Sequence, residues 1–259
     1  MSFPTLDESL RQQRLQPPTG KVSLVLDTDT YNEIDDQFAV AHALLSPDRL
    51  DVEAIYAAPF HNDRSSGPED GMERSYDEIL RILERLGKSG DDFALKGSRG
   101  YLTAPDAPRQ SDAAADLVRR ALTPREGPLY VVAIGAITNV ASALLLNPEI
   151  AAHIVVVWLG GHPHSWHSAH EFNLRQDVTA AQVILDCGVP FVQIPCKNVA
   201  EHLTTTKAEL EAHIAGKNPL CDFLYETFAG YSKDHYAWAK EIWDISVVEI
   251  GRASCRERV

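Results

Sequence analysis

Cysteine and long apolar runs are both scarce in this sequence of 259 residues. The four cysteines form no Cys-x-x-Cys pair, which argues against a disulfide framework or a thiolate zinc site. No apolar stretch approaches the ~20 residues that a membrane-spanning helix needs. The polar start MSFPTLDESLRQQRLQPPTG also lacks the basic and apolar segments of a signal peptide. We therefore expect a soluble, cytoplasmic protein.

Positive charge is scarce as well. The chain has 24 lysines and arginines against 37 aspartates and glutamates, which gives a formal net charge of -13. Such a surplus repels nucleic acid and anionic membrane surfaces, so we expect neither as a partner. The composition is 44% hydrophobic, which is ordinary for a globular protein with a full core. A homo-oligomer is compatible with these numbers.

Segments of strand type and helix type alternate along the chain. Short runs rich in aliphatic residues predict strands at 22–26, 52–58, 129–134, 154–159 and 191–194. Apolar spacing of helical type predicts helices at 38–45, 76–86, 138–146 and 178–185. The alternation predicts an α/β fold with a mixed, mainly parallel sheet flanked by helices and a Rossmann-like core. We expect a polar lead-in at 1–20 and one domain at 21–248.

Polar residues follow several of the predicted strands. Asp27 and Asp29 come after the first strand and Asn62 after the second, while Asp244 follows the short run 241–243. Two glycine-containing segments, 135–139 and 160–173, follow the strands at 129–134 and 154–159. Ligands of such sheets bind at the carboxyl ends of the strands. These separate segments are therefore expected to converge at one edge.

The stretch LVLDTDTYNEIDDQFAVAHALL concentrates four aspartates and a glutamate within ten residues. Asp35 or Asp36 could cap the helix that starts near Gln37, where the helix dipole favours negative charge. Capping does not account for Asp27 and Asp29 at the end of the strand. Carboxylates without interleaved His or Cys are typical of a site for Ca²⁺ or Mg²⁺, whose charge would offset the repulsion between them.

Two known families begin in this way. The segment Asp27-Thr28-Asp29-Thr30 resembles the DxDxT motif of the haloacid-dehalogenase-like magnesium phosphatases. That resemblance implies Asp27 as a nucleophile and Asp29 as a general acid. The family also needs a later acidic pair after an apolar strand. The only candidate, Asp91-Asp92, follows the polar stretch LGKSG.

The second resemblance, to the inosine/uridine-preferring nucleoside hydrolases, extends over five segments. Asp27, Asp29, Asp35 and Asp36 resemble that family's DxD and DD motifs. The later segments AIGAITNVASALL, WLGG, HEFNLRQDVTAA and IWD resemble its further motifs in the same order. The resemblance implies hydrolysis of the N-glycosidic bond of ribonucleosides to free base and ribose, with a nucleoside as the small-molecule partner. A metal-bound nucleoside binder without turnover is the non-enzymatic alternative.

The resemblance also implies roles for individual residues. Asp29 is implied as the general base and as a ligand of a Ca²⁺ cofactor. Asp36, Asp244 and the backbone carbonyl near Ile134 are implied as the remaining protein ligands. Carboxylates near the sugar would stabilise the positive charge of an oxocarbenium-like transition state. The residues implied to bind ribose hydroxyls are Asp35, Asn62, Glu171 and Asn173.

Two departures from the family pattern concern recognition of the base. The family's usual turn after the first motif is shorter and contains Gly. Common members also carry a His where this chain has Trp243. The loop HPHSWHSAH offers His164 or His167 as a substitute acid, with Trp166 stacking on the base. Alternatively the loop histidines are solvated, and their spacing matches no common zinc pattern.

The end of the chain differs in character from the rest. The segment EIGRASCRERV resembles a translated sequencing adapter and has no apolar period. We therefore expect a non-native tail at 249–259, after a domain that lacks its last covering helices. That expectation implies open apolar surface near Ile245 and Val247.

Overall fold

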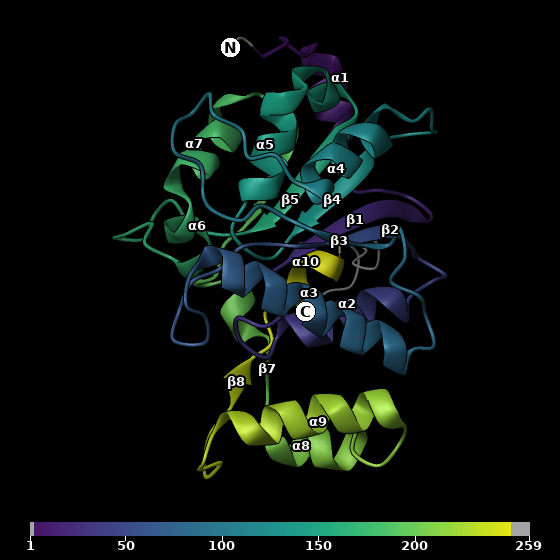
Figure 1. The fold of residues 1–259 in the computed structure, drawn as a ribbon, viewed down its shortest axis with the longest axis vertical. Helices are drawn as coiled ribbons and strands as arrows, with labels where there is room; N and C mark the ends of the chain where they lie inside the picture. Colours follow the sequence, from purple (N-terminus) through teal and green to yellow (C-terminus); the bar gives the residue numbers. More distant parts are fainter. Residues whose placement is uncertain (1–2, 250–259) are drawn as a thin grey trace.

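The computed structural model of this chain describes residues 3–249. The tail predicted at 249–259 therefore lies outside the described residues, apart from Glu249. The strands of the main sheet are β1 (Val22–Thr28), β2 (Leu50–Ala57), β3 (Ala94–Lys96), β4 (Leu129–Ala133), β5 (Ile154–Leu159) and β6 (Phe191–Ile194). They form a parallel sheet in the order β3-β2-β1-β4-β5-β6 (Figure 1). The predicted α/β fold is confirmed.

The order of the strands creates a switch point between β1 and β4. From β1 the chain moves outward through β2 to β3, then returns to place β4 on the other side of β1. Helices on the two sides of such a point diverge and leave a crevice at the carboxyl ends of the strands. Asp29 follows β1 and Gly135 follows β4, so both lie at this crevice.

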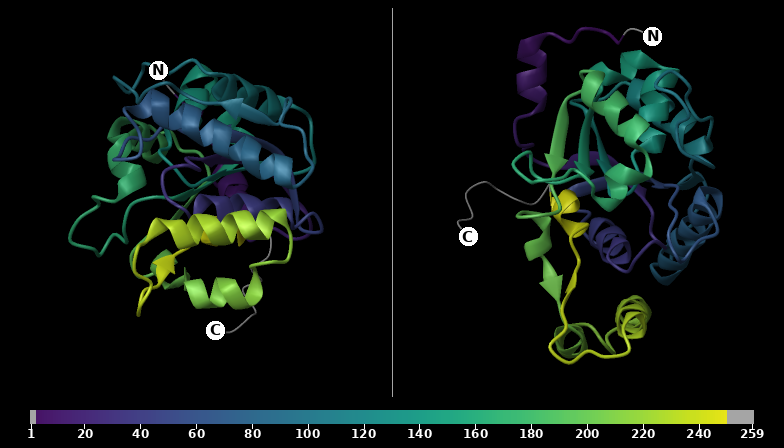
Figure 2. Two further views of the ribbon diagram at one scale, coloured as in Figure 1. Left: turned by 60° about the horizontal axis from the view of Figure 1, so that its bottom comes forward. Right: turned by 90° about the vertical axis from the view of Figure 1, so that its left-hand side faces the viewer.

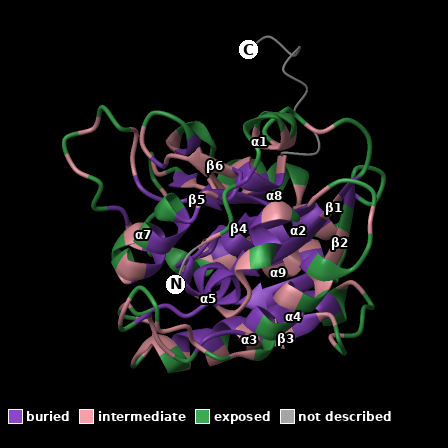
Figure 3. Ribbon diagram, turned by 90° about the horizontal axis from the view of Figure 1, so that it is seen from above, coloured by how far each residue is buried: buried purple, intermediate pink, exposed green. Residues whose placement is uncertain are grey.

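Helices cover both faces of the sheet. One face packs against α2 (Asp36–Leu44), α3 (Pro68–Arg85) and the short α10 (Ile245–Val248). The other face packs against α4 (Asp112–Leu122), α5 (Thr138–Leu146) and α7 (Val178–Asp186). All six residues of β5 are buried, as expected for a strand covered on both sides. Figure 3 shows the buried strands beneath helices with exposed outer faces.

Alternate residues of β5 belong to two separate cores. Val155, Val157 and Leu159 join the core under α2 and α10. Val156 and Trp158 join the core under α5 and α7. Successive side chains of a strand point to opposite faces, so this alternation follows from strand geometry. Leu159 and Trp158, at the end of β5, therefore face opposite sides of the sheet.

A small module projects from the crevice edge. It contains an antiparallel sheet of β7 (Thr204–Thr205) and β8 (Lys240–Glu241), which holds the pair α8 (Lys207–His213) and α9 (Pro219–Tyr231). Figures 1 and 2 show this helix pair at the far end of the molecule from the N-terminus. The remaining helices are α1 (Glu8–Arg14), η1 (Pro148–Ala152), α6 (Phe172–Gln176) and η2 (Ala200–His202).

Several predicted boundaries differ from the structure. The strand predicted at 22–26 continues to Thr28, because Asp27 pairs in register with Tyr56 of β2 and Ala133 of β4. The lead-in at 1–20 contains α1, and Arg11 donates to the carbonyl of Gly188 at 2.7 Å.

The expectation of open apolar surface at Val247 is wrong. Val247 and Val248 are buried in the core that includes residues of α2, while Ile245 is half-buried against the same core. The short helix α10 therefore buries its own apolar side chains against that core. Within residues 3–249, no helix is long and apolar enough to cross a membrane.

Candidate metal centre and active site

Asp29 lies in the turn that follows β1. Its side chain is fully buried, and neither carboxylate oxygen accepts a hydrogen bond from any described residue. Gly135, which follows β4, passes close to it: a Cβ atom there would lie 3.1 Å from the carboxyl carbon of Asp29. A larger residue at position 135 would therefore force Asp29 or Ala58 to shift by a few tenths of an ångström. A buried carboxylate without protein donors is costly unless another group binds it.

Three further carboxylates converge from different segments. Asp35 precedes α2, Asp36 begins it, and Asp244 precedes α10. One oxygen from each lies within 4.8 Å of the others, and all three residues are buried. Thr28 donates to Asp36. Neither Asp35 nor Asp244 makes a side-chain capping hydrogen bond, so helix capping does not explain their positions.

The cluster resists ionisation. Burial is the largest cause in every case, and it raises the pKa of Asp35 to about 6 and that of Asp36 to about 8. Burial, reinforced by neighbouring carboxylates, also raises the pKa values of Asp29 and Asp244 well above the ordinary range. Without a cation the site therefore retains protons. A hard cation fits this set of donors, because it would stabilise all four charged forms at once.

A small cavity adjoins the three converging carboxylates. Its volume of ≈ 30 Å³ suits an ion or a water molecule, and is far below the volume that small-molecule sites usually have. Asp29 does not line this cavity. The residues that line it are Asn32, Glu33, Asp35, Asp36, Ile134, Leu159, Glu171, Phe172, Asn173, Cys196, Trp243 and Asp244.

Glu171 and Asn173, predicted to bind ribose, line the cavity but also support the backbone. Glu171 accepts from the amide of Gly161 at 2.8 Å and from two amides at the start of α6. The side-chain amide of Asn173 donates to the carbonyls of Ile134 and Leu159 at 3.2 and 2.9 Å. Both side chains are therefore positioned by the ends of β4 and β5.

Asn62, the fourth residue predicted to bind ribose, does not line the cavity. Its amide donates to the backbone and side-chain oxygens of Asn32, at 3.2 and 2.6 Å. Asn32 lines the cavity in its place. Three further lining residues were not predicted from the sequence to bind a ligand, although they lie within or directly beside its motifs: Asn32, Glu33 and Phe172.

Asp27 has a structural role here. Its carboxylate accepts from the side-chain amide of Asn139 at 2.7 Å, and burial raises its pKa to about 7. Asn139 also accepts from the amide of Ser98, so it joins the ends of β1, β3 and α5. Asp27 does not line the cavity. This placement does not suit the nucleophile that the phosphatase resemblance implied.

The histidine loop lies on the other face of β5. His162, His164 and Trp166 line a separate cavity of ≈ 180 Å³ together with Trp158. Trp158 belongs to the opposite core from Leu159, which lines the carboxylate cavity. Trp166 packs against the ring of His167, with 5.2 Å between centroids. The structure therefore does not bring His164, His167 or Trp166 together with the aspartates.

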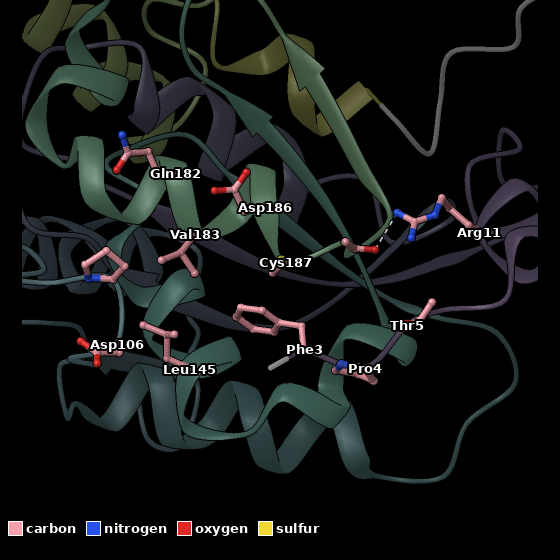
Figure 4. Close-up of a pocket in the computed structure, with 12 residues that line it drawn as sticks. Phe3, Pro4, Thr5, Arg11, Asp106, Leu145, Gln182, Val183, Asp186 and Cys187 are labelled. Atoms are coloured by element: carbon pink, nitrogen blue, oxygen red, sulfur yellow. Dashed lines mark hydrogen bonds between the residues drawn. The ribbon is translucent and has the colours of Figure 1, made fainter. Parts of the chain in front are cut away.

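A much larger cavity contains none of the aspartates of the cluster. It has a volume of ≈ 780 Å³ and is lined by residues of the N-terminal segment and by the ends of α5 and α7, among them Phe3, Arg11 and Asp186 (Figure 4). Helices of a parallel α/β sheet end near the amino ends of the strands. This cavity therefore lies at the edge opposite the carboxylates.

The fold and the cluster together define an α/β protein with buried carboxylates gathered at the carboxyl edge of its sheet. Compared with known families, the chain matches the family described as inosine-uridine preferring nucleoside hydrolase over residues 24–250. It belongs to this family. The chain is thus a hydrolase acting on N-glycosyl compounds, of a family that depends on a metal ion.

Individual relatives agree with this assignment. The chain is 30% identical to the pyrimidine-specific ribonucleoside hydrolase RihA of Escherichia coli O1:K1 / APEC, over 82% of this chain and 72% of that protein. Its fold is similar to that of a purine-preferring ribonucleoside hydrolase from Gardnerella vaginalis, with a TM-score of 0.69 and 23% identity, over 88% of this chain and 79% of that one. A plant nucleoside hydrolase, PpNRh1, has a TM-score of 0.69 at 22% identity, over 91% and 79% of the two chains.

The raised pKa values predict how stability depends on pH without a cation. Between the ordinary pKa of Asp and the folded values of about 6 and 8, the folded chain binds more protons than the unfolded chain. The contribution of the cluster to the stability of protein kept in chelator should therefore fall as the pH rises from about 4 to about 8. Thermal melts across this range measure it. A flat profile in chelator would contradict the prediction, and a divalent cation should reduce the decline.

Proposed function

We propose that this chain hydrolyses the N-glycosidic bond of ribonucleosides with Ca²⁺ as its metal cofactor. The buried group of Asp35, Asp36 and Asp244, with the buried Asp29 near it, is the observation that supports calcium most directly. Calcium accepts six to eight oxygen ligands in flexible geometry, whereas Mg²⁺ demands an octahedron and usually retains several waters. Four carboxylates and the nearby carbonyl of Ile134 suit the larger, less demanding ion.

Asp29 is proposed as the general base. Its two oxygens accept no hydrogen bond from described residues, so a carboxylate oxygen is available to accept a proton from a water. A calcium ion bound among these residues would lower the pKa of an adjacent water and orient vicinal hydroxyls. Asp29 would then take the proton from the water that attacks C1′ of the ribose.

The ribose is proposed to lie at the edge of the carboxylate cavity. Asp35, Glu171 and Asn173 line this cavity from three different segments and present oxygen and amide groups. Asn62 would join them by exchanging its bonds to Asn32 for a sugar hydroxyl. Carboxylates so close to the sugar stabilise the positive charge that develops as the glycosidic bond breaks.

The leaving base is proposed to be a pyrimidine. The relative of 30% identity named above is a pyrimidine-specific ribonucleoside hydrolase. Trp243 lines the cavity where common family members carry a His, and an indole cannot donate a proton as an acid. Purines, whose departure depends strongly on protonation, should be the poorer substrates. A place in nucleoside salvage, in the cytoplasm, belongs to the same proposal.

Calcium binding provides the first test. Calorimetry on chelator-treated protein should show one strong site for Ca²⁺, because three buried carboxylates lie close enough to share one cation. Asp36→Ala should weaken this binding severely, whereas Asp186→Ala, at the opposite edge of the sheet, should leave it unchanged. Undiminished affinity in Asp36→Ala would remove this residue from the ligand set.

Asp29→Asn tests the general base. The amide keeps the shape of the side chain but cannot accept the proton, so turnover should fall by a factor of roughly 10² to 10⁴. Loss of a ligand charge would add to this effect. Release of base from uridine, measured at saturating calcium on folded protein, gives the result. Near-parental turnover would exclude Asp29 as the base.

The histidine loop remains a prediction that kinetics can decide. If His164 or His167 donates the proton to the leaving base, its replacement by Ala should lower turnover of inosine more than that of uridine, and remove the alkaline limb of the pH-rate profile, where a general acid loses its proton. Their position on the opposite face of β5 favours the contrary result. Unchanged inosine cleavage in both variants would leave the loop without a catalytic role.

A further inference from the structure

An ion pair joins the acidic turn after β1 to the segment that leads into Asp244. The Nζ atom of Lys240 lies 2.7 Å from Oε2 of Glu33. The side chain of Lys240 is only 10% exposed and that of Glu33 is 33% exposed, so water screens the pair less than an ordinary surface ion pair. The two residues lie 207 positions apart, yet each is close in sequence to a carboxylate of the cluster.

The ammonium group of Lys240 has a defined position. The residue lies on β8, where it pairs with Thr205 of β7. Its Nζ atom donates to the carbonyl of Glu241 at 3.2 Å and lies 5.2 Å from the centre of the Trp243 ring. Trp243 itself lines the carboxylate cavity. Lys240 is therefore packed against the site rather than extended into solvent.

Glu33 is held from its other side as well. Arg64 donates to the backbone carbonyl of Glu33 at 2.8 Å, and Asn62 donates to the backbone of Asn32. The loop after β2 thus anchors the backbone of the turn. The side chain of Glu33 is left to reach across to β8, where it meets Lys240.

The ion pair opposes the repulsion within the cluster. Asp35 and Asp36 lie on the side of Glu33, and Asp244 lies on the side of Lys240, four residues further along the chain. These three carboxylates lie within ligand spacing of one another. We propose that Lys240 is a positioning residue, whose ion pair with Glu33 holds the two segments together and preforms the calcium site. This proposal deepens the proposed function and rests on it.

A competing role for Lys240 predicts the opposite change in calcium affinity when the residue is replaced. If Lys240 were only a nearby positive charge, it would repel an incoming cation, and its removal would tighten calcium binding. If it holds the two carboxylate-bearing segments together, its removal weakens binding even though the site becomes more negative. The variant Lys240→Met separates these roles, because Met keeps most of the aliphatic length without the charge.

The experiment is calorimetric titration of calcium into the full chain after chelator treatment. Lys240→Met should bind calcium at least about tenfold more weakly than the parent, the lower end of the loss seen when groups that orient metal ligands are removed. Lys240→Arg, which can still pair with Glu33, should keep the parental affinity. Lys21→Met is the matched control, since Lys21 pairs with Asp51 at the amino ends of the strands and the charge change is the same.

Kinetics add a readout that a general structural defect would not give. At saturating calcium, kcat of Lys240→Met should return to the parental value, because the cation itself then draws the segments together. If Lys240→Met does not fold, Lys240→Gln gives the same decision. The loss of affinity caused by Lys240→Met should be smaller in a Glu33→Gln background than in the parent, since the two residues share one interaction.

The outcomes are distinct. Equal or tighter calcium binding by Lys240→Met overturns the positioning role while leaving the calcium proposal intact. Weak binding by Lys240→Arg as well as Lys240→Met, without recovery of kcat at saturating calcium, also overturns it. A parent chain that binds no calcium overturns the proposed cofactor, and the positioning role with it.

Discussion

Mutual repulsion among buried carboxylates is the constraint around which this molecule is built. Asp29, Asp35, Asp36 and Asp244 are all buried, and two of these residues make no capping bond that would offset the loss of water. Burial alone makes each charge costly, and proximity adds to the cost. Only a fold that is stable elsewhere can hold such a set together. Here the two cores on either side of a parallel sheet provide that stability.

Three agents can offset this repulsion, and they compete. Protons do so when the pH is low, as the raised pKa values of the aspartates indicate. Lys240 does so partly, because its charge lowers the pKa of Asp35 while its own is raised by Asp35 and Glu33. A divalent cation does so most completely, and it alone also orients a sugar diol. The affinity of the site for a divalent cation therefore depends on how much of the repulsion is already offset by protons and by Lys240.

The sequence was informative wherever chemistry and periodicity coincide. The predicted segments 138–146, 154–159 and 191–194 match α5, β5 and β6 at both ends, because apolar runs bounded by Pro, Gly or Asn leave little choice. The grouping of Asp36 with Asp244 was implied by the family resemblance. Strand order does not account for it, because Asp244 follows β8, which belongs to the small antiparallel sheet and not to the parallel one. For α5, β5 and β6, the residues that create the apolar pattern are also those that pack in or against the two cores, so the predicted and observed bounds agree.

Sequence reasoning was weaker where the outcome depends on the third dimension. The loop after β5 begins next to Leu159, but its histidines pack beside Trp158 on the opposite face. A shift of one residue along a strand changes the face, and no local pattern in the loop indicates which side it takes. The pairing of Glu33 with Lys240 could not be predicted from the sequence either, because it depends on how the small module with β8 packs against the turn after β1.

The size of the carboxylate cavity bears on how a nucleoside enters. A volume of ≈ 30 Å³ holds a cation or a water but no nucleoside. The groups proposed to hold the ribose meanwhile bond to the protein: Asn62 to Asn32, and Glu171 to Gly161. Ribose hydroxyls both donate and accept, so a hydrogen bond broken on entry can be replaced by one to the sugar. Part of the binding energy of the ribose is then used to open and order the site, and it does not appear as affinity.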